Sequence, residues 1–170
     1  MCMFLDCCTS VFNVPDKVPG SSWLIGMSTI RGVARVLIDY RSGSMDYDDL
    51  RPLPNTPATP TIRRYNDNRL GAVYSSLHGF WTSRHAAANA IGQNAAIARR
   101  DAYSVILFDN SATTCISNDF TSSPDDLLNG IVAHCAGGGT NYTGALAAAQ
   151  SLIVQHWSNE RCVAPVCRYA

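Results

Sequence analysis

The order of the apolar segments predicts a three-layer α/β domain with a largely parallel sheet. Short β-branched runs alternate along the chain with longer segments whose apolar residues recur at helical spacing. The chain has 170 residues, of which 46% are hydrophobic and 15% charged, so one domain can bury a sizeable core. Ligands of such sheets bind at the carboxyl ends of the strands, and the loops at those ends are therefore the first place to look for a site.

Charge and cysteine content narrow the classes of function. Thirteen basic and thirteen acidic residues cancel, which argues against binding to nucleic acid or to an anionic membrane through bulk charge. The apolar stretch over 106–116 is interrupted by Asp109 and is too short to span a bilayer. The first residues lack the basic region of a secretory signal, and seven cysteines are an odd number for a disulfide framework. Together these features predict a cytoplasmic protein with free thiols.

The N-terminal part of the chain contains one clear strand. Residues 1–32 show no period and are predicted to be an extension, with the domain spanning 33–170. The run over 33–38 is predicted to be a buried parallel strand, followed by a loop that starts at Asp39. Residues 46–68 hold four of the eight prolines and no period, which predicts a long, exposed and mobile loop or insertion.

The remaining segments complete the predicted sheet and its helices. Hydrophobic spacing predicts a helix over 69–85, with 86–98 as an alternative continuation, and then strands over 103–108 and 112–116 paired as a hairpin. Capping residues predict a second helix that starts after Ser123 and is stopped by the glycines at 137–139. A helix over 143–157 and a fourth strand over 162–169 follow.

Oxygen-bearing side chains gather in two of the predicted loops. Asp39, Ser42 and Ser44 follow the first strand, and Thr140 follows three glycines. Hard divalent cations such as Mg²⁺ accept oxygen ligands, and a carboxylate can hold waters that the ion coordinates. An ordinary turn is the alternative for the first loop, because Ser, Gly and Asp are common in turns. A phosphate-binding loop at the glycines is disfavoured because no lysine follows them.

These two loops, Ser-Gly-Ser-Met after the strand and Gly-Gly-Gly-Thr-Asn-Tyr between two helices, resemble the von Willebrand factor A family over residues 33–169. The resemblance implies a doubly wound, Rossmann-like, mostly parallel sheet, truncated here after the fourth strand. It also implies a metal-ion-dependent adhesion site with the pattern Asp-x-Ser-x-Ser. In that site Ser42, Ser44 and Thr140 would bind Mg²⁺ or Mn²⁺ directly, and Asp39 would act mainly through water.

The chain departs from the family pattern in three places. Two residues separate Asp39 from Ser42 where the family has one, so either a bulge redirects Asp39 or Tyr40 takes the aspartate position. The proline-rich segment 46–68 separates the first loop from the first helix. The family's third motif, a strand ending in Asp-Gly, is not found before Ala170.

By this resemblance the protein is a non-enzymatic binding module in which Mg²⁺ bridges to an Asp or Glu carboxylate of a protein partner. One alternative is a truncated von Willebrand factor A fragment, or the product of an incorrect gene annotation, without metal binding. Another is a hydrolase that uses the same ion as a Lewis acid. That reaction needs a general base, and neither loop contains a His or Glu, the only glutamate being Glu160.

Overall fold

A computed structural model describes residues 3–6, 23–29, 32–90 and 101–157. The side chains are described from Arg35 onward within these ranges. The predicted strand over 162–169 lies outside the described residues, and so does the part of the alternative helix continuation beyond Ala90.

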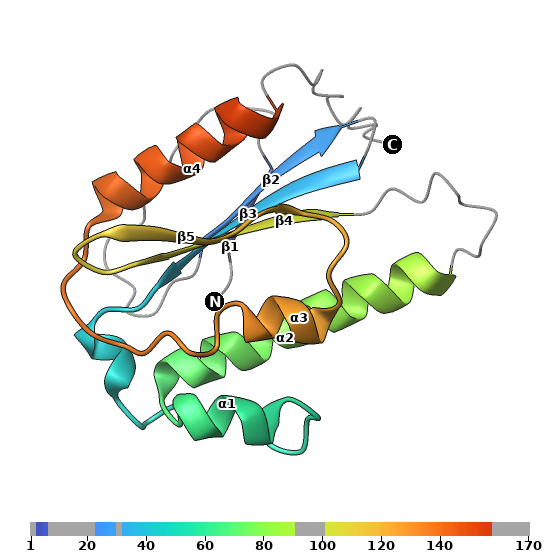
Figure 1. The fold of residues 1–170 in the computed structure, drawn as a ribbon. Helices are drawn as coiled ribbons and strands as arrows, with labels where there is room; N and C mark the ends of the chain where they lie inside the picture. The colour runs from blue at the N-terminus through green and yellow to red at the C-terminus, as the bar shows by residue number, and fades with distance from the viewer. Residues whose placement is uncertain (1–2, 7–22, 30–31, 91–100, 158–170) are drawn as a thin grey trace, which may run out of the picture.

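The described residues form a single mixed sheet whose five strands lie side by side in chain order (Figure 1). The strands are β1 (Met3–Asp6), β2 (Trp23–Thr29), β3 (Gly32–Tyr40), β4 (Ala102–Phe108) and β5 (Ala112–Asp119). The pairs β1–β2 and β3–β4 are parallel, whereas β2–β3 and β4–β5 are antiparallel.

The predicted doubly wound, Rossmann-like and mostly parallel sheet is therefore wrong, and the chain forms a small α/β fold with a mixed sheet. The reason is the length of the connections. Thr29 pairs with Gly32, and Phe108 pairs with Ala112, so the chain reverses within a few residues at both places. A parallel connection needs a crossover of a dozen residues or more, and only the segment between β3 and β4 supplies one with described helices.

Helices cover both faces of the sheet (Figure 1). They are the short 3₁₀ helix η1 (Gly43–Asp46), α1 (Thr59–Tyr65), α2 (Arg69–Ala90), α3 (Pro124–Asn129) and α4 (Tyr142–Trp157). In the view of Figure 1, α4 lies above the sheet and α1, α2 and α3 lie below it. The predicted helices starting near 69, 124 and 143 are confirmed, but α3 ends at Asn129, well before the glycines that were predicted to stop it.

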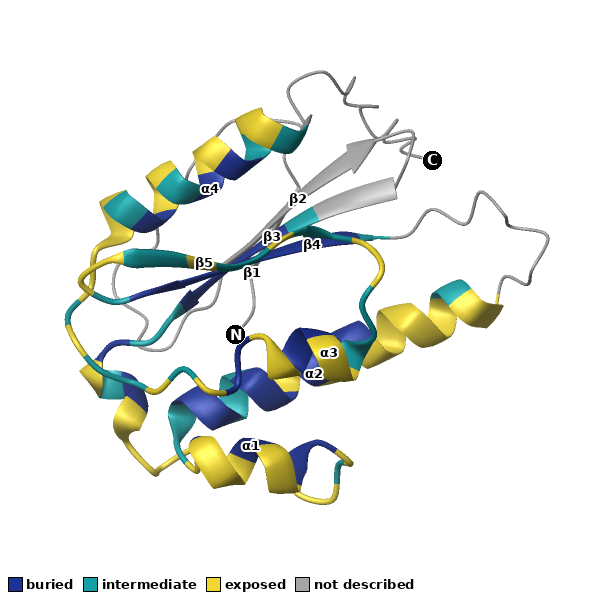
Figure 2. Cartoon of the chain, viewed as in Figure 1, coloured by how far each residue is buried: buried dark blue, intermediate teal, exposed yellow. Residues whose placement is uncertain are grey.

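The larger core lies between the sheet and α2. Leu37, Val105 and Leu107 of the sheet pack against a cluster that includes Tyr74 and Trp81, both almost completely buried (Figure 2). Apolar residues recur on α2 every three or four positions, and this spacing places them on one face of the helix.

The smaller core lies between the opposite face of the sheet and α4. Val36 and Ile38 of β3 join Ala145, Ala149 and Leu152 of α4 there, together with Ile106 and Phe108 of β4. Leu146 and Val154, also on α4, are 43% and 57% exposed, so the apolar residues of this helix do not all face the sheet. Leu37 faces α2 whereas Val36 and Ile38 face α4, which is the alternation expected of a strand.

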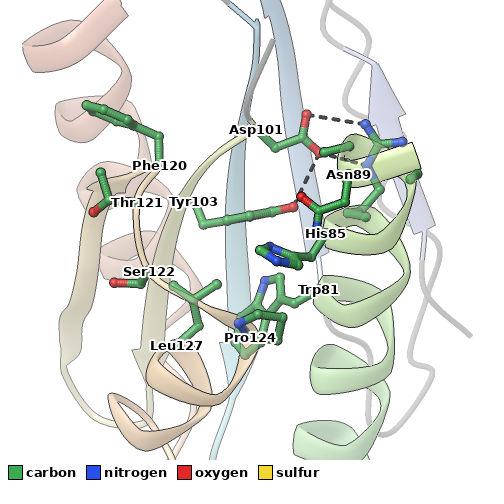
Figure 3. Close-up of a pocket in the computed structure, with 13 residues that line it drawn as sticks. Trp81, His85, Asn89, Asp101, Tyr103, Phe120, Thr121, Ser122, Pro124 and Leu127 are labelled. Carbon is green, nitrogen blue, oxygen red and sulfur yellow. Dashed lines mark hydrogen bonds and ion pairs between the residues drawn. The ribbon is translucent and has the colours of Figure 1, made fainter. Parts of the chain in front are cut away.

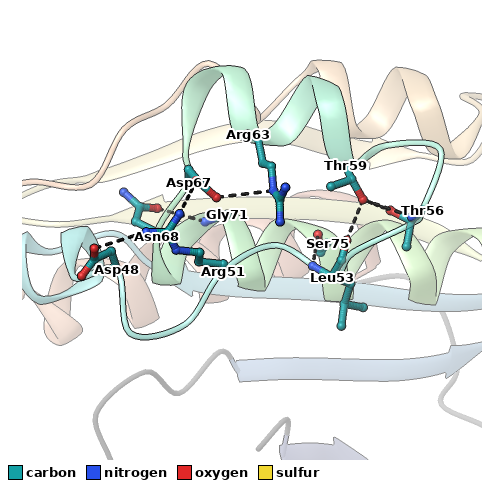
Figure 4. Close-up of polar contacts among 10 residues, drawn as sticks. All are labelled: Asp48, Arg51, Leu53, Thr56, Thr59, Arg63, Asp67, Asn68, Gly71 and Ser75. Carbon is teal, nitrogen blue, oxygen red and sulfur yellow. Dashed lines mark hydrogen bonds and ion pairs between the residues drawn. The ribbon is translucent and has the colours of Figure 1, made fainter.

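The proline-rich segment is ordered in the structure, in contrast to the predicted mobile loop. It contains α1, and polar contacts hold it to its surroundings (Figure 4). Arg51 pairs with Asp67 at 2.7 Å, and the Leu53 N–H donates to Ser75 Oγ of α2 at 3.2 Å. Thr59 Oγ1 donates to the Leu53 carbonyl at 2.6 Å. The segment therefore packs against α2 close to the end of β3.

Candidate functional site

Three loops meet where the parallel strands β3 and β4 end. The Gly43 N–H donates to the Gly138 carbonyl at 3.1 Å, and the Gly137 N–H donates to the Arg41 carbonyl at 2.7 Å. A third backbone bond of 2.6 Å joins the N–H of Asn141 to the carbonyl of Asp109. The two loops in which the sequence places the candidate ligands are thus joined directly through their backbones.

Four hydroxyl groups gather at this junction, and we call them the hydroxyl cluster: Tyr40, Ser42, Ser44 and Thr140. The Tyr40 hydroxyl lies 2.7 Å from Thr140 Oγ1 although the two residues are 100 positions apart. Ser42 Oγ and Ser44 Oγ lie 3.0 Å apart. Ser44 Oγ donates to the Tyr40 hydroxyl over 3.5 Å, the outer limit of a hydrogen bond. Three of the four predicted metal ligands are therefore brought together, with the Tyr40 hydroxyl between them.

The fourth predicted ligand, Asp39, is only 1% exposed. Successive residues of a strand point to opposite faces, so Asp39 lies on the α2 side and Tyr40 on the α4 side. Burial raises the pKa of Tyr74 on α2, and the negative charge of Asp39 raises it further, consistent with this placement. The Tyr40 hydroxyl lies among the predicted ligands, and whether Tyr40 or Asp39 takes the family's aspartate position remains a prediction. A metal-ligating role for Asp39 remains a prediction.

Aromatic packing fixes the position of the Tyr40 ring. Its centroid lies 5.5 Å from that of Phe108 at the end of β4. It is also stacked on Tyr142 in the first turn of α4, with a centroid distance of 6.2 Å and an interplanar angle of 10°. The phenol is therefore held over the site by neighbours on two other elements, and its hydroxyl points to the cluster without depending on hydrogen bonds alone.

The hydrogen bonds of the cluster favour the ionised form of Tyr40. Burial raises the pKa of this phenol, but bonds with Ser42, Ser44 and Thr140 together outweigh burial, and the net shift is downward. The carboxylate of Asp109, the residue that follows β4, pairs with Arg41 at 2.9 Å. Its pKa is lowered chiefly by the backbone N–H of Ser111, and the Arg41 charge adds to that effect.

The glycine-rich loop depends on two specific local features. Gly138 has a φ of +74°, and a Cβ at this position would lie 3.1 Å from Cβ of Asp109. Asn110 Oδ1 accepts the N–H of Gly139 at 2.9 Å, and Asn141 Oδ1 accepts the N–H of Gly144 and so caps the start of α4. These contacts set Thr140 in place opposite Tyr40.

Sequence reasoning weighed Tyr40 only as an occupant of the aspartate position and did not include Asn110, Asn141 or the Arg41–Asp109 pair. For Tyr40 the signal was its spacing of two residues from Ser42. For Asn141 the signal was an asparagine directly before a helical period. The other contacts join loops that are distant in sequence, so no local pattern indicates them.

A second feature, at the opposite end of the same strands, is a cavity of about 180 Å³ between α2, β4 and the segment after β5 (Figure 3). Trp81, Tyr103 and Phe120 contribute aromatic walls. Asp101 also lines the cavity, and its side chain, only 5% exposed, accepts hydrogen bonds from Arg35 at 2.9 Å and from Arg84 at 2.8 Å. This carboxylate is thus neutralised by two arginines, and no residue that the sequence analysis selected lies here.

The described residues contain neither a cluster of the usual metal-binding side chains nor a membrane-spanning helix. Within them, no three His, Cys, Asp or Glu side chains lie close enough together to hold a metal ion. The helices of the same residues include none that is both long and apolar enough to cross a membrane.

Comparison with known proteins leaves the family unassigned. No family model matches the chain, and no curated protein matches it. One solved structure that is similar is an uncharacterized membrane spanning protein from Vibrio fischeri, with 18% sequence identity and a TM-score of 0.48. The match covers 71% of this chain and 48% of that one, so the chain spans about half the length of that protein. Membership of the von Willebrand factor A family therefore remains a prediction from the sequence.

Proposed function

We propose that the protein is a non-enzymatic, protein-binding module, and that the hydroxyl cluster is its recognition site for an Asp or Glu carboxylate of the partner, bridged by Mg²⁺ or Mn²⁺. The observation that carries this proposal is the convergence of Ser42, Ser44 and Thr140 from two loops at the carboxyl end of β3. A location in the cytoplasm belongs to the same proposal and rests on the sequence alone.

The spacing of the hydroxyl oxygens suits an octahedral cation. Mg²⁺ binds oxygen ligands at about 2.0–2.1 Å, so two ligands at right angles around the ion lie about 2.9 Å apart. The Ser42 and Ser44 oxygens are 3.0 Å apart. Ser42, Ser44 and Thr140 would hold the ion, which when bound supplies a positive charge and an open coordination position for a carboxylate.

The surroundings of the cluster also suit an acidic ligand. Thr140 is exposed, Ser44 is half-buried and Ser42 is buried, so solvent reaches the cluster from the side of Thr140. Thr140 lies two residues before α4, a helix of 16 residues whose N-terminal end carries partial positive charge. The nearby Asp109 is paired with Arg41, which reduces its repulsion of an incoming carboxylate.

Thermal unfolding in the presence of Mg²⁺ or Mn²⁺ tests the proposal without knowledge of the partner. A ligand at about 100 times its Kd is expected to raise the Tm of a chain of this size by about 5–10 °C. Ser44→Ala should abolish that rise. Ser76→Ala, which removes an exposed serine hydroxyl from α2, is the matched control and should leave it unchanged. An equal rise in both variants would place the ion elsewhere and contradict the proposal.

A further inference from the structure

The geometry points to a role for Tyr40 as an intramolecular competitor of the cation: its hydroxyl occupies the centre of the hydroxyl cluster, and a divalent ion binds tightly only when that hydroxyl is removed or displaced. We propose this as a regulatory feature of the site, and it rests on the function proposed above.

The contacts of Tyr40 define the competition. Its hydroxyl forms a hydrogen bond with Thr140 Oγ1 at 2.7 Å and accepts one from Ser44 Oγ at 3.5 Å. The phenol therefore contacts two of the three proposed ligands at once. A cation needs lone pairs of those same oxygens directed toward the centre of the cluster. The phenol and the ion therefore draw on the same atoms.

Aromatic packing also holds the phenol in the position from which it competes with a cation for the cluster oxygens. Phe108 and Tyr142 pack against its ring, and displacement of the hydroxyl has to break that packing or open the loop that carries Thr140. An aspartate at this position would have a short side chain and a negative charge that attracts the ion. Tyr40 instead places a phenol hydroxyl at the same spacing before Ser42 and Ser44, and this hydroxyl is already bonded to the proposed ligand Thr140.

Two substitutions separate the effects of the hydroxyl and the charge. Tyr40→Phe keeps the ring and its packing but removes the competing hydroxyl. Tyr40→Asp removes the whole occupant and creates the Asp-x-Ser-x-Ser pattern. When a binding-competent state is populated only in part, the apparent affinity falls by that fraction. If the phenol is bonded about nine-tenths of the time, Tyr40→Phe strengthens cation binding about tenfold, and Tyr40→Asp strengthens it further.

The experiment is a titration of the full chain with Mn²⁺, in which free Mn²⁺ is measured by its electron paramagnetic resonance signal. The wild type, Tyr40→Phe, Tyr40→Asp and the control Tyr142→Phe are compared, with circular dichroism to show that each is folded. The control removes a hydroxyl from the stacked neighbour of Tyr40. We expect it to bind as weakly as the wild type, and Tyr40→Phe and Tyr40→Asp to bind in that order of increasing affinity.

The possible results distinguish the two proposals. If the wild type binds Mn²⁺ as tightly as Tyr40→Phe, and Ser44→Ala abolishes binding, the competition is refuted while the proposed function stands. If no variant binds, both proposals fail. If Tyr40→Asp does not fold, the Mn²⁺ affinity of Tyr40→Phe compared with that of the wild type still tests the competition, because Tyr40→Phe retains the aromatic packing.

Discussion

The two ends of the parallel pair β3–β4 satisfy their polar groups in opposite ways. At the amino end the buried Asp101 carboxylate is fixed between the guanidinium groups of Arg35 and Arg84. At the carboxyl end the contacts of the cluster run between hydroxyl groups, with Tyr40 bonded to Thr140.

By our proposal, this difference separates a structural site from a binding site. Removing a charge from a buried ion pair leaves its partners uncompensated and is costly, so the amino end is not free to exchange partners. A hydrogen bond between neutral hydroxyls contributes only about 1 kcal/mol, and a ligand with stronger acceptors can replace it. This is why we propose the carboxyl end as the end that binds an external ligand.

The largest expected effect is at the amino end. Asp101→Asn should lower the free energy of unfolding by about 3 kcal/mol, because Arg35 loses its buried counter-charge. Urea unfolding at neutral pH measures the change. The matched control is Asp48→Asn, whose carboxyl is 79% exposed beside Arg51 and should change stability by less than about 0.5 kcal/mol. Equal effects in the two variants would remove the distinction between the two ends.

An intermediate effect is expected in the glycine-rich loop. Gly138→Ala should destabilise the fold by about 1–2 kcal/mol, because the residue has positive φ and its Cβ would meet Asp109. Gly137→Ala is the control, since no atom lies within 4 Å of a Cβ there. Thermal unfolding of both variants checks the difference, and a Gly138→Ala protein as stable as Gly137→Ala would show that the loop does not need its observed backbone.

A smaller loss is expected when the hydroxyl of Tyr40 is removed. Tyr40→Phe should lower the free energy of unfolding at pH 7 by about 0.5–1 kcal/mol, because the ring packing is kept and only neutral hydrogen bonds are lost. Tyr65→Phe, at a residue of α1 that is 46% exposed, is the control and should leave the free energy of unfolding unchanged. A loss of several kcal/mol in Tyr40→Phe would mean that the cluster is a rigid structural element unsuited to ligand exchange.

The smallest effects are the pH dependences of two tyrosines, which should have opposite signs. The pKa of Tyr40 is lowered in the folded state, so the stability that its ionised form contributes appears as pH rises toward the usual value of 10.0. Burial, with Asp101 as a lesser cause, raises the pKa of Tyr103 to about 12, so stability from its neutral form is lost between about pH 10 and 12. The free energies of unfolding of Tyr40→Phe and Tyr103→Phe, each compared with that of the wild type over pH 8–11, measure the two pH dependences. Changes of the same sign with pH would contradict the environments assigned to the two tyrosines.

Local signals in the sequence were sufficient for most of the described elements. The runs over 33–38 and 103–108 are strands, and in each the last three or four residues are apolar and buried between helices on the two faces of the sheet. Ser123 and Pro124 start α3 through a capping box in which Ser123 Oγ accepts the Asp126 N–H.

The arrangement of the strands could not be predicted in the same way. Pairing direction depends on which strand lies beside β3, and β2 was hidden in a segment whose prolines and glycine obscured any period. The helix α1 was missed because prolines were taken as signs of a loop, although Pro60 lies in the first turn, where no intrahelical N–H is required.

The candidate site was predictable in its composition but not in its arrangement. Ser42, Ser44 and Thr140 were found because short patterns of Ser, Gly and Thr occur at strand and helix ends. The position of the Tyr40 hydroxyl depends on packing against Phe108 and Tyr142, which come from two other elements. Such contacts between distant segments leave no local pattern.

The most direct test of the account is a crystal structure of Tyr40→Asp grown with Mn²⁺, in which anomalous scattering locates the ion. The account predicts one ion within coordination distance of the Ser42, Ser44 and Thr140 hydroxyl oxygens at the carboxyl end of β3. An ion bound only elsewhere, or none at the cluster while its hydroxyls remain bonded to one another, would contradict it.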